Sequence, residues 1–376
     1  MKEWKEYKLR ELAFMKNGKK RPIGNGTFPV YGGNGIMDYT DNFNSERTII
    51  VGRVGAYCGC VYKCDDKCWV SDNAIAVYTR DLVDFYFLYY LMTTLDFHHH
   101  HIGGAQPLMT QDIIGDVNVK VPSIQTQKEV VSILKSLDDK IDCNRRINDN
   151  LEQQAQALFK SWFVDFEPFK GGEFVESEMG MIPKNWSVKQ LGDVTVQQNE
   201  KVKDRTDVKV LSPVTTGELV LSEEYFTKQV YSESVSKYIV VRPKDFAYNP
   251  ARVNIGSLGM NEFEFDGCVS PVYVVFRCEN EYQYYFDLFR HTEFFKEEVK
   301  TRAIGGVRQS LGYKDFSLIK VVYPPIDVIH KFNQVYSKIL ANIKSNKTEI
   351  ARLASLRDTL LPKLMSGELK VNVLNA

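Results

Sequence analysis

The sequence lacks a net charge, because its 48 lysines and arginines are balanced by 48 aspartates and glutamates. Proteins that bind nucleic acid without regard to sequence usually carry a basic surplus that neutralises phosphates, so the balance argues against that class. It does not exclude local basic patches. Residues 1–21 hold eight basic residues against three glutamates, and residues 326–376 hold eight against four acidic residues. If the termini lie together, one end of the molecule is basic.

The sequence also lacks a long apolar run and a secretion signal. No run approaches the roughly 18 residues of a membrane span, and Met1-Lys2-Glu3-Trp4 does not begin a signal peptide. Seven cysteines, an odd number, favour reduced thiols without disulfides, and we expect a cytoplasmic protein. The 376 residues, 44% hydrophobic, can bury two cores of ordinary size.

No catalytic motif is recognisable. The sequence has no nucleophile paired with a base, no acidic cluster and no phosphate-cradling glycine loop. Tyr248-Asn249-Pro250-Ala251 partly resembles the loop with which amino-methyltransferases hold a target adenine, but it lacks the second proline and the aromatic residue. No glycine-rich turn for S-adenosylmethionine accompanies it, so we interpret it as a turn before a strand. The sequence therefore argues against catalysis.

Two clusters invite comparison with metal sites. Cys58, Cys60, Cys64 and Cys68 lie within eleven residues, but without the paired C-x2-C spacing of common zinc sites. We interpret them as small buried thiols, with zinc as the alternative. Four consecutive histidines at 98–101 cannot all point to one centre, so we expect a polar loop that touches DNA and predict no metal.

The strongest positive feature is an internal repeat at an offset of 305 − 103 = 202 residues. The repeated positions are Gly103-Gly104 and Gly305-Gly306, Pro122 and Pro324, and Ile124 and Ile326. Each half opens on a tryptophan, Trp4 or Trp186, and continues through short strands and an aromatic helical patch. The second half is longer by about 20 residues, which we assign to loops.

Each half ends in a long helical stretch, at about 127–165 and 328–364, each on the order of 55 Å long. Apolar residues recur at spacings of three and four, the period of a two-helix seam, with Asn144 and Asn346 as polar positions that fix its register. The seam comprises Leu134, Leu137, Ile141, Asn144, Leu151 and Leu158, and then Tyr336, Ile339, Ile343, Asn346, Leu353 and Leu360. We favour packing of the two helices on each other; packing of each on its own domain is the alternative.

Chain closure predicts the direction of these helices. The second domain joins the end of the first helix to the start of the second, and a compact domain of about 140 residues is only about 30 Å across. Those two helix ends must therefore be close. We predict antiparallel helices with one domain at each end and the two termini side by side.

The expected fold class is α+β, with two α/β domains in tandem repeat separated by two long helices packed as an antiparallel coiled coil. Domains are predicted at 1–125 and 184–326, and helices at 126–165 and 327–366. Proline and glycine mark 166–183 as a linker, and 367–376 is a tail.

Several side chains suited to DNA contact lie in turn-rich stretches. Arginine and lysine bind phosphates, while glutamine suits adenine edges and arginine suits guanine edges. Arg53 and Arg252 fall on corresponding turns, and Gln106 and Arg308 each follow a double glycine. The candidate contacts are Lys19, Lys20, Arg21, Asn34, Arg53, Gln106, Asn249, Arg252, Arg302 and Arg308. Solvated ion pairs and hydrogen bonds within the loops are the alternatives.

Three strings carry a family resemblance. They are Ala-Leu-Phe-Lys-Ser-Trp-Phe-Val-Asp-Phe at 157–166 with Pro168, Pro122-Ser123-Ile124 with Gln127, and Leu-Arg-Asp-Thr-Leu-Leu-Pro-Lys-Leu-Met-Ser-Gly at 356–367. With the repeat, they make nearly the whole chain resemble a specificity subunit of a type I restriction-modification system.

The resemblance implies two target-recognition domains, each reading one half of a split asymmetric DNA site, on either side of a helical spacer. It also implies two docked methyltransferase subunits and motor-nuclease restriction subunits. S-adenosylmethionine, ATP and magnesium would bind those partners, and none would bind here. The seam from Leu134 to Trp162 rises about 42 Å, near the 34–36 Å of one DNA turn. Ala155 corresponds to Arg357 in the repeat and Asn148 to Ile350, so the two helices and their docking faces are not equivalent.

Overall fold

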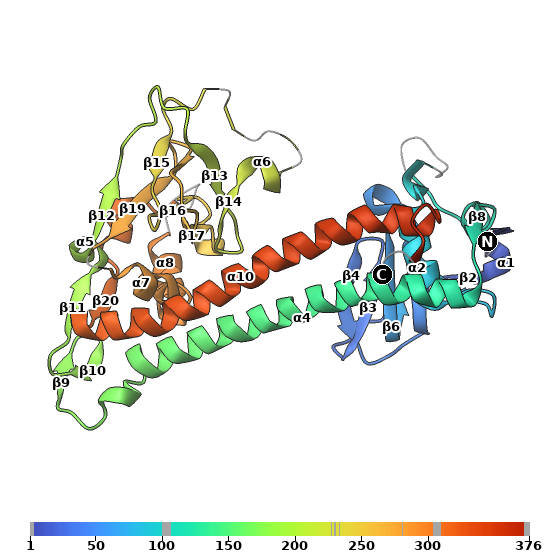
Figure 1. Ribbon diagram of the computed structural model, residues 1–376. Helices are drawn as coiled ribbons and strands as arrows, with labels where there is room; N and C mark the ends of the chain where they lie inside the picture. Colours follow the sequence, from blue (N-terminus) through green and yellow to red (C-terminus); the bar gives the residue numbers. More distant parts are fainter. Residues whose placement is uncertain are drawn as a thin grey trace. The chain divides into compact units, whose positions relative to one another are not determined.

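The computed structural model describes residues 4–99, 107–226, 228, 231–232, 234–279, 281–303 and 310–371. Its contacts divide the chain into two compact units, Met1–Arg146 with Asn346–Ala376 (unit 1) and Ile147–Ser345 (unit 2). Figure 1 labels many of the helices and strands of both. No helix in the described part of the chain is long and apolar enough to cross a membrane.

Unit 1 is built around a six-stranded sheet in the order β2-β7-β5-β6-β3-β4, with a separate β1-β8 ladder. Its elements are β1 (Lys5–Lys8), α1 (Leu9–Leu12), β2 (Ala13–Asn17), β3 (Phe28–Gly32), β4 (Gly35–Thr40), β5 (Ser45–Gly52), η1 (Gly55–Tyr57), β6 (Val61–Val70), β7 (Ala74–Thr79), α2 (Phe85–Thr94), η2 (Phe97–His99), α3 (Gln111–Gly115) and β8 (Asn118–Val121). It also takes in the first part of α4 (Ile124–Phe163) and the last part of α10 (Ile326–Met365).

Local sequence explains how these elements form. β5 and β7 lie inside the sheet, and both carry the continuous buried runs that a strand covered on two faces needs. Asp84 begins α2, because its carboxylate accepts hydrogen bonds from the N–H groups of Tyr86 and Phe87. The apolar side chains of α2 then join the same core as Ile49 and Val77 of the sheet.

Unit 2 contains two four-stranded sheets, β12-β19-β16-β17 and β14-β13-β18-β15, the β9-β10 hairpin, and a two-stranded antiparallel ladder of β11 and β20. Its elements are η3 (Glu167–Phe169), β9 (Phe174–Ser177), β10 (Gly180–Pro183), β11 (Ser187–Gln190), α5 (Leu191–Val194), β12 (Thr195–Gln198), β13 (Lys209–Pro213), β14 (Leu219–Leu221), α6 (Ser222–Tyr225), β15 (Ile239–Val241), β16 (Phe246–Tyr248), η4 (Val253–Ile255), β17 (Leu258–Met260), β18 (Gly267–Val269), β19 (Val274–Cys278), α7 (Gln283–Phe289), α8 (Glu293–Arg302), α9 (Tyr313–Phe316) and β20 (Lys320–Tyr323).

The predicted repeat is confirmed at the level of strand register. β1 pairs with β8 as β11 pairs with β20, with Lys5 opposite Val121 and Ser187 opposite Tyr323. The order β2-β7-β5-β6 recurs as β12-β19-β16-β17. The units differ between these shared strands, because unit 1 adds β3 and β4 to its sheet whereas unit 2 forms a second sheet from β13, β14, β15 and β18.

The two long helices are antiparallel, as predicted. In unit 1, Asp138 of α4 pairs with Arg357 of α10 at 2.8 Å, and further along α4 Asn144 donates to Glu349 at 2.8 Å. As the residue number along α4 rises, the residue number of its partner on α10 falls, so the two helices run antiparallel. The hydrogen bond from Asn144 lowers the pKa of the Glu349 carboxyl.

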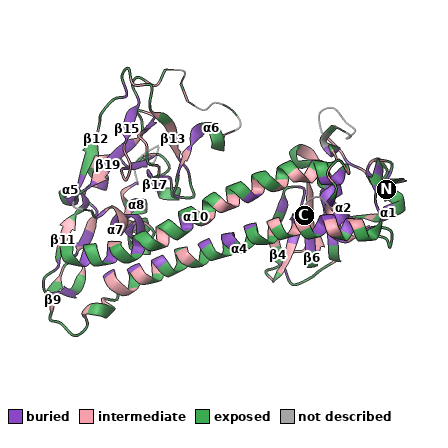
Figure 2. Ribbon diagram, in the orientation of Figure 1, coloured by how far each residue is buried: buried purple, intermediate pink, exposed green. Residues whose placement is uncertain are grey.

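The main hydrophobic core of each unit contains residues of both helices. In unit 1 the core includes Leu134 of α4 and Leu364 of α10, and in unit 2 it includes Phe159 and Phe163 of α4 and Phe332 of α10. Figure 2 shows buried positions recurring along both helices among exposed ones. The helices therefore pack on each other and on the domains, so the two interpretations of the seam are both partly right.

The seam positions divide into two groups by burial. Buried are Leu134, Ile141, Asn144, Tyr336, Ile343 and Leu353, and half-buried are Leu137, Leu151, Leu158, Ile339, Asn346 and Leu360. Towards its end, α4 buries Ala155, Phe159 and Phe163 more deeply than Leu158. The spacing of four brings these side chains into the core of unit 2, whereas Leu158 packs at its margin.

The segment expected to be a linker, 166–183, has regular structure. It contains η3 and the β9–β10 pair, and its aromatic side chains Phe166 and Phe169 contact Trp186 at ring-centroid distances of 5.3 and 5.1 Å. The two compact units include parts of both long helices, whereas the predicted domains stop before the helices, at 125 and 326. The wide apolar face of each helix explains this difference.

The ends of the described chain lie together within unit 1. The ring of Trp4 lies so close to Gly367 that a Cβ added there would be 2.7 Å from Trp4 Cε2. Leu364, Met365 and Val371 enter the core that the N-terminal residues also form. The prediction that the termini are side by side is confirmed.

Leu353 and Leu356 test the helix packing with the same residue type on the same helix. Leu353 is 8% exposed and Leu356 is 46% exposed. We expect Leu353→Ala to lower the free energy of unfolding by about 2–5 kcal/mol, because it leaves a cavity. Leu356→Ala should change it by less than about 0.5 kcal/mol. Urea denaturation followed by circular dichroism measures both, and equal effects would contradict the packing.

Gly367 tests the closure of the chain ends. Its φ of 75° and its approach to Trp4 both disfavour a side chain. We expect Gly367→Ala to destabilise the protein by at least about 1 kcal/mol. In a Trp4→Ala background the loss should shrink, because the clash disappears and only the backbone strain remains. An undiminished loss in thermal denaturation of the double variant would argue against the contact.

Candidate nucleic-acid interface

In unit 1 the turn between β6 and β7, residues 71–73, brings separate loops together. After β2 the chain runs directly against this turn, with the Gly18 N–H donating to the Ala74 carbonyl and the Lys19 N–H to the Val70 carbonyl, both at 3.0 Å. A Cβ on Gly18 would lie 1.9 Å from the Ser71 carbonyl oxygen, so only glycine allows this approach. Lys19 and Lys20 follow as exposed side chains.

Arg53 reaches the same turn from the end of β5. Its backbone N–H donates to the Asn73 carbonyl at 2.9 Å, and its Nη1 lies 3.4 Å from the Asp72 carbonyl oxygen. Gly33 lies opposite, where an added Cβ would be 3.6 Å from the Asn73 carbonyl oxygen. The exposed Asn34 follows Gly33 directly. Three predicted contacts, Lys19, Asn34 and Arg53, therefore converge on one turn.

Arg21 is less available than the two lysines before it. Its guanidinium forms an ion pair with Asp38 on β4. The pair joins the basic turn to the edge strand of the sheet. Arg21 thus has a structural partner within unit 1, and its charge is partly balanced.

A further loop meets the Arg53 loop. The Gly55 N–H donates to the Pro107 carbonyl at 3.1 Å, and the Met109 N–H donates to the Arg53 carbonyl at 2.8 Å. Gln106 and the first double glycine come just before Pro107 and lie outside the described residues. The chain leaving that glycine loop is therefore fixed beside Arg53.

Unit 2 repeats this arrangement with different side chains. The hairpin loop 249–257 is closed by the Asn249 N–H donating to Ser257, as the loop 52–60 is closed by the Gly52 N–H donating to Cys60. The Leu311 N–H donates to the Pro250 carbonyl at 3.0 Å, just as Met109 donates to Arg53.

This equivalence corrects one expectation. Pro250 stands at the place of Arg53, and Arg252 at the place of Gly55, so the two arginines share a loop but not a position. Sequence comparison missed this because the strands leading into the loops have different lengths. The Asn249 side chain accepts from the Ala251 N–H at 3.0 Å, which closes a tight turn, and Arg252 is exposed beyond it.

The remaining candidates in unit 2 divide differently. Arg302, half-buried on α8, donates to the Glu298 carboxylate through Nε and Nη2 at 3.0 and 2.9 Å. It therefore has an intrahelical partner one turn away. Arg308 and the second double glycine lie outside the described residues.

Tyr57 is a candidate that sequence reasoning missed. It lies in η1 within the Arg53 loop and is 53% exposed. Its counterpart in the loop of unit 2 is Asn254. An aromatic residue in a glycine-rich turn is the sequence signal that could have indicated it, because tyrosine combines a large apolar ring with a polar hydroxyl and is enriched at interfaces.

The cysteines near this loop have structural surroundings. Cys58 is buried, and its thiol lies 3.5 Å from the Arg53 carbonyl oxygen. Cys64 and Cys68 belong to a small core with Tyr31, where a hydrogen bond with Cys68 lowers the pKa of the Cys64 thiol to about 7. No group of three or more potential ligands with metal-site geometry occurs among the described residues. Of the histidine run, His99 contacts Asp96 at 2.5 Å.

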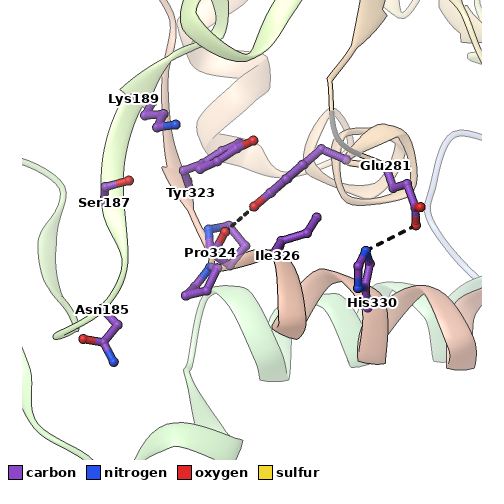
Figure 3. Close-up of a pocket in the computed structure, with 10 residues that line it drawn as sticks. Asn185, Ser187, Lys189, Glu281, Tyr323, Pro324, Ile326 and His330 are labelled. Carbon is purple, nitrogen blue, oxygen red and sulfur yellow. Dashed lines mark hydrogen bonds and ion pairs between the residues drawn. The ribbon is translucent and has the colours of Figure 1, made fainter.

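A separate cavity of about 550 Å³ lies in unit 2, beside the start of α10 (Figure 3). Tyr282 stacks on Tyr323 with ring centroids 4.0 Å apart, and Lys189 Nζ lies 4.0 Å from the centroid of Tyr323. His330 and Glu281 approach to 3.7 Å on its other side. None of the predicted DNA contacts lines this cavity, so it is distinct from the loop interface.

Residues 1–153 match the family model described as the type I restriction modification DNA specificity domain. The type I restriction enzyme MjaIX specificity subunit of Methanocaldococcus jannaschii is 28% identical over 311 residues, covering 77% of this chain and 70% of that protein. The HindI specificity subunit of Haemophilus influenzae is 23% identical over 333 residues, covering 71% and 72%.

A solved structure has the same fold. The crystal structure of a type I restriction-modification S subunit from M. genitalium matches with a TM-score of 0.62 at 16% identity, covering 96% of each chain. The likeness extends over both units and both long helices. The sequence matches make this chain similar to DNA specificity subunits of type I restriction-modification systems, and the structural match shows that it shares the fold of such a subunit.

Proposed function

We propose that this specificity subunit reads a split, asymmetric DNA site, with one half-site for each unit. The observation that carries this proposal is the pair of equivalent hairpin loops, 52–60 and 249–257, which share hydrogen-bond closure but present different side chains. Because the two loops share a backbone arrangement, each is held in the same way against its sheet. Base recognition depends on side chains, and these differ between the loops. Two unlike readers on one repeated framework suit an asymmetric site.

The long helices supply the surfaces for methyltransferase subunits in this proposal. Ile147 on α4 and Val335 and Leu356 on α10 are exposed although apolar, so neither core accounts for them. Two methyltransferase subunits would dock on the helices and domains, and restriction subunits would join that complex. Asp138 is held by Tyr90 and Arg357, whereas the Ala155 region is buried in unit 2, so the two docking faces are not identical.

The subunit itself would carry no catalytic centre. The groups near the loops include arginines, lysines, amides and buried thiols, and we identify no nucleophile paired with a base among the described residues there. Adenine methylation would therefore use S-adenosylmethionine held by the methyltransferase partner. Cleavage would use ATP and magnesium held by the restriction subunit.

Arg53 and Arg252 provide the test. In complex with the methyltransferase partner, wild-type protein should protect a split duplex site in footprinting. Arg53→Ala should weaken binding about 5- to 150-fold at one half-site only, and Arg252→Ala at the other, because a good arginine–base contact is worth about 1–3 kcal/mol.

Arg80→Ala is the matched control. Arg80 is exposed and follows β7 at the end of the strand opposite the 71–73 turn, so it should leave both half-sites protected. Equal affinity of the wild-type complex for target and scrambled duplexes at moderate salt would contradict the proposed function.

A further inference from the structure

The segment that follows β12 in unit 2 is the counterpart of the basic turn in unit 1. The paired registers of β2–β7 and β12–β19 place Ala13 and Thr195 in equivalent positions. Continuing at this offset of 195 − 13 = 182, Lys19 corresponds to Lys201 and Arg21 to Lys203. Both segments have an asparagine, then a lysine two residues later, and then a lysine or arginine two residues after that. Sequence analysis found only the first because Val202 interrupts the second basic run.

Hydrogen bonds hold this segment against the strand that leads into β15. The Val202 N–H donates to the Tyr238 carbonyl, and the Val240 N–H donates to the Glu200 carbonyl, both at 2.9 Å. Val202 is buried in a small cluster with Tyr238 and Val240. Lys201 and Lys203, on either side of the buried Val202, are both exposed.

A third lysine adjoins the same segment from the turn that leads into β15. The Lys203 N–H donates to the Ser236 carbonyl at 2.9 Å, so the exposed Lys237 adjoins Lys203. Like charges in neighbouring turns repel each other, and an anion between them would relieve that repulsion. We call Lys201, Lys203 and Lys237 the lysine cluster.

Neighbouring acids do not neutralise this cluster. Glu200 pairs with Arg242 at 2.7 Å, and Asp207 and Asp266 both pair with Arg205. Asp204 is exposed beside the cluster and offsets one of its three charges at most. Among the residues that the structure describes, none of the three lysines has an acidic partner within 4 Å.

The backbone of Lys203 supplies an independent observation. Its φ is 55°, in the left-handed region that favours glycine or asparagine. A lysine there costs stability on the order of 1 kcal/mol relative to glycine. What lysine offers at this position and glycine lacks is an exposed ammonium group.

We propose that the lysine cluster binds the phosphate backbone of the duplex at the half-site read by unit 2. Its Lys201 and Lys203 correspond to Lys19 and Arg21 of unit 1, and Lys19 lies beside the turn that Arg53 also contacts. In unit 2, β15 is inserted between this segment and β18, since Lys201 pairs with Ile239 and Ile239 pairs with Val269. The inserted strand brings Lys237 and widens the basic surface. The inference rests on the proposed function.

The test is the salt dependence of DNA affinity for the full chain with its methyltransferase partner. Each phosphate contact contributes about 0.9 to the slope of log affinity against log salt. Lys201→Ala, Lys203→Gly and Lys237→Ala should each lower the slope by about 1, and the triple variant by about 3. Affinity for target and scrambled duplexes should fall together, because phosphate contacts carry no sequence information.

Two variants distinguish a DNA contact from a structural role. Lys203→Gly should keep or raise the melting temperature while it weakens DNA binding, because glycine relieves the positive φ. Lys184→Ala removes an exposed lysine that pairs with Glu173 beside the β9–β10 strands, and it should leave the slope unchanged.

A triple variant with the wild-type slope would overturn the inference. So would a selective loss of target binding with unchanged affinity for scrambled DNA, since that result would mean base reading. Absence of salt-dependent binding by the wild-type complex would instead contradict the proposed function, and the inference with it.

Discussion

The main hydrophobic core of each unit depends on one constraint, which is that it needs a part of both long helices. Phe332 of α10 contacts Phe159, Trp162 and Phe163 of α4 within unit 2, at ring-centroid distances of 4.9 to 6.4 Å. In unit 1, α10 returns more than 200 residues later in the chain to place Leu364 and Met365 among the N-terminal strands. The core of unit 1 therefore cannot be completed until the end of α10 is present.

This constraint explains why the framework is repeated and the loops are not. Strand register, the position of the proline before each long helix and the closing hydrogen bonds of the hairpin loops recur in both units. These positions are buried or hydrogen-bonded, so few residues fit them. Loop side chains such as Arg53, Tyr57 and Arg252 contact solvent and can vary without loss of the fold.

The sequence predicted most of the framework. Heptad spacing indicated the helices, and the short span of a compact domain predicted their antiparallel direction before any contact was known. The order of strands within the sheets could not be predicted, because short apolar runs specify burial but not neighbours. The structured segment after α4 was also missed. Its glycines and prolines suggested a linker, whereas Phe166 and Phe169 anchor it against Trp186.

The candidate interface was predicted only in part. Lys19, Asn34 and Arg53 lie far apart in sequence. They come together at the β6–β7 turn, and no sequence motif predicts that they do. Arg302 was chosen for its charge, but its ion pair with Glu298 depends on the helix that separates them by one turn. Arg53 and Pro250 are different residue types, so their equivalence could not be recognised from sequence. It is evident only from the hydrogen bonds that their backbone carbonyls accept from Met109 and Leu311.

The central claim is that two unlike readers on one framework recognise separate parts of a DNA site. The most direct measurement is sequencing of methylated adenines in DNA from cells that carry this subunit with its methyltransferase, with and without exchange of residues 249–257 for the loop of a relative. The account predicts two specific segments separated by a fixed nonspecific spacer, with the exchange altering one segment only. A continuous recognition sequence, or an exchange that altered both segments, would contradict it.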